Sequence, residues 1–440
     1  MLKRLLKKLE EYKMNEYDLV IRNGLCLIND KFIKANIGIE KGIIEYVGKE
    51  NIKGETLIDA SDKLVMPGLF NAHTHVAMCI FRGLAEDLPL QSWLKDKIWK
   101  IESKLKPRDV YYGALLGIVE MIKSGTTAFY DMYFHMDEVA KAVSESKIRA
   151  ILSYGMADRW DESRAKTELK IGTEFLRKWN NRSNGKIKVI FGPHALYTCS
   201  LDFLRQVKTA AKKYNTLVHM HVSETKDEVN FVLEKYKKRP IQLLDDINFL
   251  DSNTILAHAV WITDDEIMLL KKREVSIVHN PVSNLKLTSG ISEVYKMINI
   301  GINVCLGTDG GASNNSYNLF EEIKMTLLLQ KYITCKADVL KAIDALKMAT
   351  KNGYKAYKLK GGNIKKGFLA DLILINKKSI SLVPMYNPVY SIAYSGYCDV
   401  THSIIGGELV MCNREILTVD EEKIISKAEN IANDILNRLE

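Results

Sequence analysis

The chain has 440 residues, a formal net charge of +9 and a hydrophobic fraction of 47%. This length accommodates one large domain together with a smaller one. Lysine and arginine are mixed with aspartate and glutamate along the chain, which is typical of a solvated surface and argues against a nucleic-acid footprint. The apolar runs are shorter than the ~20 residues that span a bilayer, and lysines interrupt the N-terminal one. We therefore expect no membrane partner and no secretion signal.

The cysteines are seven in number, widely scattered and never in C-x-x-C spacing. An odd, scattered set predicts reduced thiols rather than a disulfide framework. Reduced thiols are typical of a cytoplasmic protein, and we expect that location.

The N-terminal residues 1–16 place leucines at helical spacing with lysines opposite them. This pattern predicts an amphipathic helical extension that docks on its own protein, with a membrane-surface helix as the alternative. From residue 17 to 66 the pattern changes to short β runs that are separated by Asn-Gly, Asn-Asp and Lys-Gly turns. Matching runs occur in residues 365–421. We expect both chain ends to form one small composite β-sandwich domain.

Between these ends, residues 67–364 alternate apolar runs of strand length with helical patterns. Eight strands are predicted, at residues 63–70, 126–131, 149–155, 187–193, 216–222, 254–259, 275–279 and 302–307. Eight βα units predict an α/β fold with a (β/α)₈ TIM barrel, whose active site lies at the C-terminal ends of its strands. The apolar spacing in residues 422–440 predicts a C-terminal helix that packs on the protein or forms a subunit contact.

Candidate metal ligands follow three of the predicted strands. His73 and His75 form a His-x-His pair after strand one, and side chains two apart in an extended segment share a face. His221 follows strand five and Asp309 follows strand eight. Three imidazoles and one carboxylate suit a borderline ion such as Zn²⁺, with one position left for water. We predict one divalent metal ion per chain, Zn²⁺ by preference, with Fe or Mn as alternatives.

Candidate catalytic groups lie beside these ligands. Water bound to such a metal loses a proton near neutral pH. Glu224, three residues beyond His221, is predicted to move protons between this water and a substrate ring nitrogen. His258 in strand six is predicted to orient the hydroxide, and Asp309 to accept the proton of the water as well as to bind the metal.

Other histidines have a plainer interpretation. A single histidine at a strand end is more often a hydrogen-bonded core residue than a ligand, and only the convergence of several at one rim favours a metal site. His135 and His402 lack such a context, so we expect structural roles. His279, at the end of strand seven, is predicted to be structural or to lie behind the ligands.

The motifs together resemble the amidohydrolase superfamily, and specifically its mononuclear deaminase branch. The resemblance is carried by Pro-Gly-x-x-Asn-x-His-x-His ending at His75, by His-Val-Ser-Glu ending at Glu224, by the isolated His258 and by Gly-Thr-Asp ending at Asp309. It extends from about residue 17 to residue 421. The dinuclear branch usually carries a metal-bridging lysine after strand four, where this chain has His194. The resemblance therefore implies one metal.

Within that branch the chain resembles the 5′-methylthioadenosine/S-adenosylhomocysteine deaminases, including archaeal forms that act on 5′-deoxyadenosine. The supporting segments are residues 88–94, 98–105, 192–198 and 309–315. The resemblance implies that Glu102 accepts hydrogen bonds from the ribose hydroxyls, that His194 lies beside the ribose, and that Ser313 lies near the purine edge. With Glu224 and Asp309, these residues form the expected substrate-binding set.

Two further residues carry open alternatives. The resemblance implies that Trp93 covers the nucleoside and that Arg159 reaches towards its 5′ side. A core aromatic and a surface charge are the alternative interpretations. Gly310-Gly311 departs from the pattern of relatives, which often have another small residue there, and this difference bears on the loop over the base.

The leading hypothesis is hydrolytic deamination of adenosine-type nucleosides, namely 5′-deoxyadenosine, 5′-methylthioadenosine, S-adenosylhomocysteine and adenosine, to the inosine analogues by a metal-bound hydroxide. The alternative is a free-base deaminase acting on guanine or cytosine, or a triazine-type hydrolase. Glu102 discriminates between them, because a free base offers no diol. A non-catalytic barrel would have lost its metal ligands, and the cytidine-deaminase signature is absent. We expect a small-molecule nucleoside substrate, no nucleic-acid partner, and a homo-oligomer, either a dimer or a tetramer.

Overall fold

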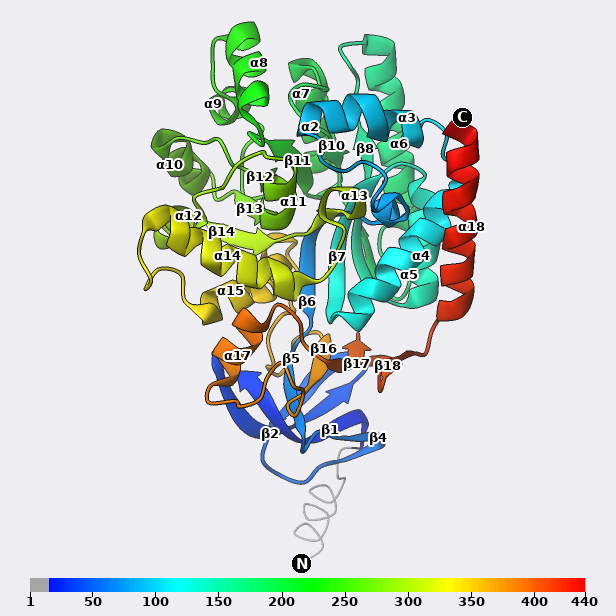
Figure 1. Ribbon diagram of the computed structural model, residues 1–440, viewed down its shortest axis with the longest axis vertical. Helices are drawn as coiled ribbons and strands as arrows, with labels where there is room; N and C mark the ends of the chain where they lie inside the picture. Colours follow the sequence, from blue (N-terminus) through cyan, green and yellow to red (C-terminus); the bar gives the residue numbers. More distant parts are fainter. Residues whose placement is uncertain (1–15, 440) are drawn as a thin grey trace, which may run out of the picture.

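The computed structural model describes residues 16–439, so the predicted helical extension at residues 1–16 lies outside the described residues except for its last position. Figure 1 shows a large α/β body above a smaller body made mainly of strands. Among the helices of the described range, none has both the length and the apolar character that crossing a membrane requires.

The strands of the α/β body are parallel and form two ladders, β10-β8-β7-β6-β15 with β9 on β8, and β11-β12-β13-β14. Their bounds are β6 (Leu69–His75), β7 (Thr126–Tyr133), β8 (Arg149–Met156), β9 (Ile187–Val189), β10 (Gly192–Pro193), β11 (Val218–Val222), β12 (Thr254–His258), β13 (Ser276–His279), β14 (Asn303–Leu306) and β15 (Asp309–Gly310). All eight predicted segments contain strands. The first predicted strand, 63–70, is divided in the structure between β5 (Lys63–Pro67) of the smaller body and β6, and His73 and His75 lie within β6 rather than after a strand.

A backbone bridge joins the two ladders at one edge, and at the other edge β14 contacts β6. A parallel bridge between Phe191 and Val218 joins the β9–β10 segment to β11. At the other edge β15 pairs with β6, where Asp309 lies opposite Thr74. These pairings give a mixed α/β body that is consistent with a TIM barrel.

Helices surround these strands (Figure 1). Along the chain they are η1 (Val76–Phe81), α2 (Leu90–Ser92), η2 (Trp93–Ile98), α3 (Trp99–Glu102), α4 (Pro107–Lys123), α5 (Met136–Ser146), α6 (Glu162–Trp179), α7 (Leu201–Lys213), α8 (Lys226–Tyr236), α9 (Pro240–Asp246), α10 (Asp264–Lys272), α11 (Pro281–Lys286), α12 (Val294–Asn299), α13 (Gly311–Asn314), α14 (Leu319–Thr334), α15 (Ala342–Met348) and α16 (Lys351–Ala356). Capping side chains determine where several of these helices begin. Helix α10, for example, begins with a capping box in which Thr263 and Glu266 each bond the other's backbone N–H.

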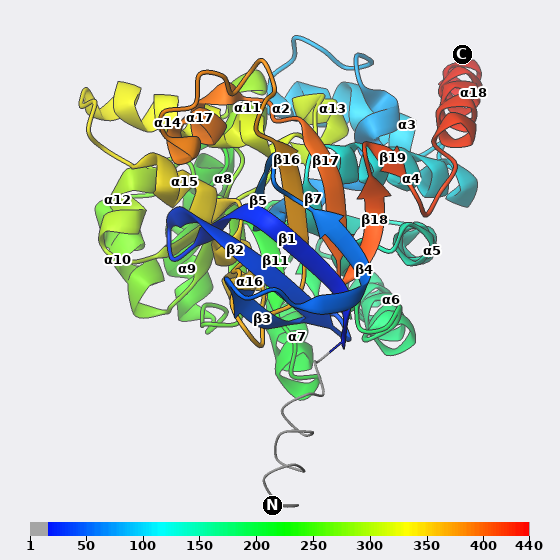
Figure 2. The same ribbon diagram turned by 90° about the horizontal axis from the view of Figure 1, so that it is seen from below.

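The smaller body is one hydrogen-bonded sheet in the order β19-β18-β17-β16-β5-β1-β2-β3, with β4 on β1. Its strands are β1 (Glu16–Ile28), β2 (Lys31–Glu40), β3 (Ile43–Gly48), β4 (Lys53–Asp59), β5 (Lys63–Pro67), β16 (Leu372–Asn376), β17 (Val400–Ile405), β18 (Glu408–Cys412) and β19 (Glu415–Ile416). Figure 2 shows the strands of the two chain ends side by side. Helix α17 (Pro388–Ser395) lies between β16 and β17 in the sequence.

The turn predicted at Asn23-Gly24 is wrong, because β1 continues through it as a β-bulge. Asn23 has a φ of +61°, and its backbone N–H donates to the side-chain oxygen of Asn36 at 2.8 Å. A side chain at Gly24 would meet Val65 at 2.7 Å. The close packing against β5 therefore requires glycine, and the pair bends the strand instead of ending it.

The C-terminal helix α18 (Glu421–Leu439) packs on α4 at the side of the large body (Figure 1). Its buried residues are Ile424, Ala428, Ile431 and Ile435. Two ion pairs connect its ends to α4: Lys123 with Glu421 at 2.7 Å, and Arg438 with Asp109 at 2.8 Å. The predicted packing role of this helix is thereby present in the structure.

A buried ion pair joins the two bodies. Arg149 at the start of β8 donates from Nε and Nη2 to the two carboxylate oxygens of Asp371, at 2.6 and 3.0 Å. The same carboxylate accepts from the Tyr354 hydroxyl at 2.8 Å and from the Gly406 N–H at 2.7 Å. The buried carboxylate of Asp371 thus accepts four hydrogen bonds. Removing this acid would leave the buried Arg149 guanidinium without its counterion.

We predict that Asp371→Ala lowers the free energy of unfolding by about 3–5 kcal/mol, the usual result of breaking one side of a buried pair. Denaturant unfolding of the purified protein measures this. The matched control is Asp399→Ala, which breaks the partly exposed pair with Arg414 and should cost at most about 1 kcal/mol. Equal losses in the two variants would contradict the linking role of Asp371.

Candidate metal centre and active site

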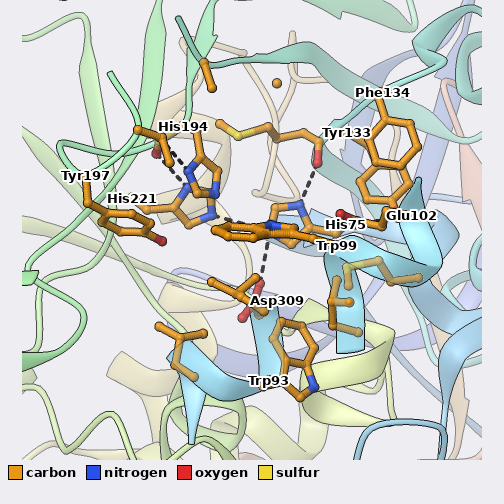
Figure 3. A pocket seen from close by; sticks show the side chains of 18 of the residues that line it. His75, Trp93, Trp99, Glu102, Tyr133, Phe134, His194, Tyr197, His221 and Asp309 are labelled. Atoms are coloured by element: carbon orange, nitrogen blue, oxygen red, sulfur yellow. Dashed lines mark hydrogen bonds and ion pairs between the residues drawn. The ribbon is translucent and has the colours of Figure 1, made fainter. Parts of the chain in front are cut away.

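Four predicted ligands converge at the C-terminal ends of the strands. His73 and His75 come from β6, His221 from β11 and Asp309 from β15. Asp309 Oδ1 lies 3.4 Å from His73 Nε2 and 3.3 Å from His75 Nε2, and His221 Nε2 lies 3.4 Å from His75 Nε2. Figure 3 shows three of them, His75, His221 and Asp309, around one point. Two overlapping groups of three have ligand atoms within 4.8 Å of one another: His73 with His75 and His221, and His73 with His258 and Asp309.

The hydrogen bonds of two of these histidines leave their Nε2 atoms free to bind. His75 Nδ1 lies 2.6 Å from the carbonyl oxygen of Met132, and His221 Nδ1 lies 2.9 Å from that of His194. A carbonyl oxygen only accepts, so each Nδ1 carries the hydrogen, and Nε2 has the lone pair whenever the ring is neutral. Burial lowers the pKa of His75, but the hydrogen bond and charge of Asp309 raise it to about 9, so without a metal a proton occupies its Nε2 at neutral pH. Facing lone pairs repel unless a cation or a proton lies between them. One proton can bridge two of these donor atoms but not all four. The set of three imidazoles and one carboxylate therefore fits a metal ion.

Asp309 is held in place as an anion. Ser283 Oγ and Ser313 Oγ donate to its Oδ2 at 2.6 and 3.0 Å, which leaves Oδ1 facing the imidazoles. Burial alone would raise its pKa, but the neighbouring imidazoles of His73 and His75 hold the pKa well below its usual range. An ionised carboxylate with one oxygen fixed is the form that binds a metal.

Glu224 follows β11 and faces the same site. Its Oε1 accepts from Ser289 Oγ at 3.0 Å, and its Oε2 lies 3.7 Å from His258 Nε2. Burial, together with the negative charge of Asp309, raises the pKa of Glu224 to about 8. A carboxyl group with this pKa keeps its proton at neutral pH and donates it readily.

His258 ends β12 with its ring oriented by two amides. Asn284 Nδ2 lies 2.9 Å and Asn280 Nδ2 lies 3.3 Å from His258 Nδ1. Because an amide nitrogen only donates, His258 Nδ1 accepts and Nε2 carries the hydrogen towards Glu224. Burial lowers the pKa of His258, which favours this neutral form.

The loop that carries Glu224 is fixed by a second buried acid. Glu228, in the first turn of α8, accepts the backbone N–H of Ser223 and that of Glu224, each at 2.9 Å. Ser223 has a φ of +50°, in the left-handed region, as do His258 at +75° and Asp309 at +64°. Such conformations persist where the surroundings determine them, and they gather here at the site.

A cavity of about 420 Å³ opens beside these groups. Its lining includes the predicted residues His75, Glu102, His194, His221, Glu224, His258 and Asp309, together with Trp93 and Arg159. Figure 3 shows Trp93 and Trp99 on one side and Tyr133 and Phe134 beside Glu102. The volume and the mixture of aromatic walls with few polar groups are typical of a small-molecule site.

Glu102 lies at the end of α3 on the wall of this cavity. Its Oε1 accepts from the Tyr133 hydroxyl at 2.8 Å. Burial raises the pKa of Glu102 to about 7, against the lowering by the Tyr133 hydrogen bond. The second oxygen has no protein partner among the described residues, so this carboxylate retains acceptor capacity for a ligand.

His194 presents a neutral ring to the cavity. Its Nδ1 lies 2.9 Å from Thr198 Oγ1, whose hydroxyl lies 3.2 Å from the Ala195 carbonyl oxygen. If the hydroxyl donates to that carbonyl, Nδ1 donates to the hydroxyl and Nε2 remains an acceptor. Burial, with the charge of His75, lowers the pKa of His194 to about 3.

The structure also places Arg159, Trp93 and Ser313, for which the sequence predicted contacts with the substrate. The Arg159 guanidinium lies over the Trp99 ring, with its carbon 5.8 Å from the ring centroid. Trp93 is buried in the cavity wall. Ser313 is buried against Asp309 and is outside the described cavity lining, so its contact with a purine edge stays a prediction.

The remaining histidines lie apart from the ligand cluster. His135 is exposed at the start of α5, and His402 lies in the lower sheet. His279 is buried at the end of β13, and neither ring nitrogen has a hydrogen-bond partner among the described residues. These positions agree with the structural interpretation of all three.

Several contributing residues were not predicted from the sequence: Tyr133, His219, Glu228, Asn280, Ser283, Asn284 and Ser289. Three of them lie in Asn-Pro-Val-Ser-Asn, residues 280–284, directly after β13. A polar segment at a strand end was the available signal there. Tyr133 and His219 lie inside strands and gave none.

Comparison with known proteins agrees with this geometry. The chain matches the Amidohydrolase family over residues 64–410. The chain belongs to the amidohydrolase family. This amidohydrolase is 49% identical to 5-methylthioadenosine/S-adenosylhomocysteine deaminase 2 of Archaeoglobus fulgidus, over 96% of this chain and 99% of that protein. It is 46% identical to 5′-deoxyadenosine deaminase of Methanocaldococcus jannaschii, over 92% and 99%. The predicted family resemblance is confirmed.

Solved structures share the fold. A zinc-bound adenosine deaminase from Xanthomonas campestris superimposes with a TM-score of 0.91 and 30% identity, covering 96% of this amidohydrolase and 99% of that chain. A zinc-bound atrazine chlorohydrolase from Arthrobacter aurescens gives a TM-score of 0.88 at 20% identity, over 94% and 100%, and shows the fold alone.

We predict that the purified protein contains about one divalent ion per chain, since the donors describe one catalytic site. Replacing His221 by Ala removes one donor, so metal content and activity should fall together. Elemental analysis after dialysis measures the metal. The control His135→Ala changes an exposed histidine and should keep its metal. Two ions per chain, or full activity without metal, would contradict this assignment.

Proposed function

We propose that the protein hydrolytically deaminates adenosine-type nucleosides, such as 5′-deoxyadenosine, 5′-methylthioadenosine, S-adenosylhomocysteine and adenosine, to the inosine analogues with release of ammonia. The observation that carries this proposal is one cavity that has a metal-donor set and a protonated Glu224 at one wall and the Glu102 carboxylate at another. The names of the relatives at 46–49% identity support the same substrate class.

We propose that His73, His75, His221 and Asp309 hold one divalent ion, with Zn²⁺ as the expected metal. The zinc-bound structural relative at 30% identity and the donor chemistry support this choice. When bound, the metal supplies Lewis-acid chemistry that makes water a good nucleophile near neutral pH.

Side chains of the protein transfer the protons in this reaction. Glu224 donates its proton to the purine N1 as the amine-bearing carbon is attacked, and a carboxyl group with a raised pKa suits this task. His258, with its hydrogen fixed on Nε2 by the two asparagine amides, positions the attacking water. Asp309, held as an anion by two serines, accepts a proton from that water. Ammonia leaves when the nitrogen is protonated.

The substrate groups are assigned along the cavity. Glu102 accepts from the two ribose hydroxyls, and His194 offers Nε2 beside the ribose. Trp93 covers the nucleoside, and Arg159, over Trp99, lies on the 5′ side. Ser313 is assigned to the purine end. The cavity lining supports four of these positions, and the family resemblance supplies the fifth.

A free-base deaminase or triazine hydrolase is the second candidate. The structural relatives include triazine hydrolases, but at 20% identity they share only the fold. A free base would leave the second oxygen of the half-buried Glu102 carboxylate without a partner, and a partly buried acceptor without a hydrogen bond is unfavourable. Glu102 therefore favours the nucleoside.

We also propose the domain organisation, the cellular location and the assembly of this enzyme. A closed (β/α)₈ barrel over residues 67–364 and a β-sandwich from residues 17–66 and 365–421 are supported by the edge pairings and by the sheet shared between the chain ends. Residues 422–440 form the C-terminal helix. The cysteines, free at all seven positions, support a cytoplasmic location. The assembly is a homo-oligomer, a dimer or tetramer, with no nucleic-acid or membrane partner.

The direct experiment is ammonia release from a panel of nucleosides and bases, with Glu224→Gln as the test variant. The amide keeps the shape but has no proton to transfer, so kcat should fall by roughly 10² or more while the metal stays bound. Glu234→Gln, on the exposed face of α8, is the matched control. Near-normal turnover in Glu224→Gln would place the proton transfer elsewhere.

A second experiment tests Glu102. Adenosine-type nucleosides should be deaminated far better than 2′,3′-dideoxy analogues or free adenine, because an unpartnered buried acceptor rejects them. Each hydrogen bond to a charged group contributes about 1.5–3 kcal/mol, so Glu102→Ala should lower kcat/KM for the intact nucleoside more than tenfold and narrow the gap. Asp96→Asn, an exposed acid nearby, is the control. Equal rates on guanine or cytosine would overturn the nucleoside assignment.

The pKa of Glu102 adds a pH dependence. The carboxyl is protonated below about pH 7 and then accepts hydrogen bonds poorly, so KM for the nucleoside should rise as the pH falls through 7. Michaelis curves between pH 5 and 9 measure this. In Glu102→Gln, KM should be higher and should lack that acid limb. An unchanged limb in the variant would assign it to another group.

A further inference from the structure

His219 is a buried histidine on β11, two residues before His221, and it contacts His73 from behind. Its Nε2 lies 2.9 Å from His73 Nδ1, and its Nδ1 lies 3.0 Å from the Tyr357 hydroxyl. That hydroxyl lies 2.6 Å from the carbonyl oxygen of Ala72. All of these residues are buried. The three contacts form a continuous chain of hydrogen bonds that starts at a metal donor and ends on the backbone.

The end of this chain determines the position of every hydrogen in it. The Ala72 carbonyl only accepts, so the Tyr357 hydroxyl donates to it and its oxygen is left to accept from His219 Nδ1–H. Neutral His219 then has its lone pair on Nε2, where it accepts from His73 Nδ1–H. His73 Nε2 is consequently left with a lone pair directed at the metal site.

One further observation agrees with this direction. His73 Nε2 is buried and makes no hydrogen bond among the described residues, although Asp309 Oδ1 lies 3.4 Å away, as expected of two donors that face one metal position. If the hydrogen were on His73 Nε2 instead, the Nδ1 lone pair of His73 would have to accept a hydrogen from His219. The Nδ1 lone pair of His219 would then need the hydroxyl hydrogen that the Ala72 carbonyl takes.

His73 differs in this respect from the other two imidazole donors. His75 and His221 donate directly to backbone carbonyls. His73 donates to a neutral side chain, and the outer partner of a metal-binding histidine usually fixes both its tautomer and its orientation. The outer partner, His219, must itself be held in one tautomer. The hydroxyl of Tyr357, at the end of α16, holds it by accepting from its Nδ1–H.

We propose that His219 and Tyr357 are positioning residues that hold His73 in the tautomer required for metal binding. This inference rests on the proposed metal centre. It extends that centre through the aromatic core to α16, so a hydroxyl that is remote from the cavity contributes to metal affinity. A neutral relay also adds no charge to a site with three imidazoles and one carboxylate.

The stack around His219 provides a matched control. Tyr130 stacks on His219 with ring centroids 4.0 Å apart, and it also stacks on Tyr357 at 5.5 Å. The Tyr130 hydroxyl bonds to Ser153 at 2.7 Å and lies outside the relay. Tyr130→Phe and Tyr357→Phe therefore remove the same atom from the same stack, but only the second breaks the chain to His73.

The experiment measures Zn²⁺ affinity of the metal-depleted full-length protein by competition with a chromogenic chelator. Tyr357→Phe should weaken affinity about tenfold or more, as loss of an outer partner typically does, whereas Tyr130→Phe should leave it unchanged. His219→Gln places an amide oxygen where it can accept from His73 and should retain most of the affinity. His219→Leu removes the acceptor and should lose more than either tyrosine variant.

Thermal unfolding of the metal-free proteins separates this role from a packing role, because both tyrosine variants should lose similar stability. Equal Zn²⁺ affinity in Tyr357→Phe and Tyr130→Phe, or wild-type affinity in His219→Leu, would overturn the relay. A wild-type protein that binds no Zn²⁺ would overturn the metal centre and the relay together. Tight Zn²⁺ binding with no nucleoside deamination would overturn only the proposed substrate.

Discussion

The structure depends on mutual repulsion that only a cation relieves. Imidazole lone pairs and a carboxylate oxygen from β6, β11 and β15 meet within hydrogen-bonding distance, and the ring hydrogens of His75 and His221 are committed to carbonyls on the other side. Such an arrangement is unfavourable unless a metal ion or a proton fills it. Strands far apart in the sequence therefore bring their donors to one point, and each must be held firmly enough to oppose the repulsion.

The surrounding acids divide the work by their environment. Asp309 stays ionised because imidazoles face it, while Glu224, which is buried, and Glu102, which is half-buried, have raised pKa values. Glu224 lies near the proposed ligands and Glu102 on the wall beside Tyr133. One cavity thus contains three carboxyl groups with different pKa values, which is the arrangement that separates acid from base roles. Glu228 of α8 binds the backbone around Glu224 and thereby fixes the position of the Glu224 side chain.

Sequence reasoning selected residues that converge in the structure because each of them ends a regular apolar run, and parallel strands bring such ends to one rim. The eight strands, the C-terminal helix and the converging His73 and His75 followed from local patterns. The outer partners did not, since the identity of a neighbour across a barrel depends on side-chain packing rather than on periodicity. His219 looks like an ordinary strand residue until His73 and Tyr357 are seen on either side of it. The bulge at Asn23 was missed because a distant asparagine side chain stabilises it.

The junction between the two bodies has a consequence for the order of assembly. Strand β5 passes into the ligand strand β6 at Gly68, where an added Cβ would lie 2.0 Å from Thr127 Oγ1, and β5 lies in its sheet between β1 and β16. His73 and His75 thus directly follow a strand, β5, whose neighbour β16 is synthesised near the end of translation. Complete pairing of β5 must await the C-terminal part of the chain, so the start of β6 becomes fully anchored only after most of the chain has left the ribosome.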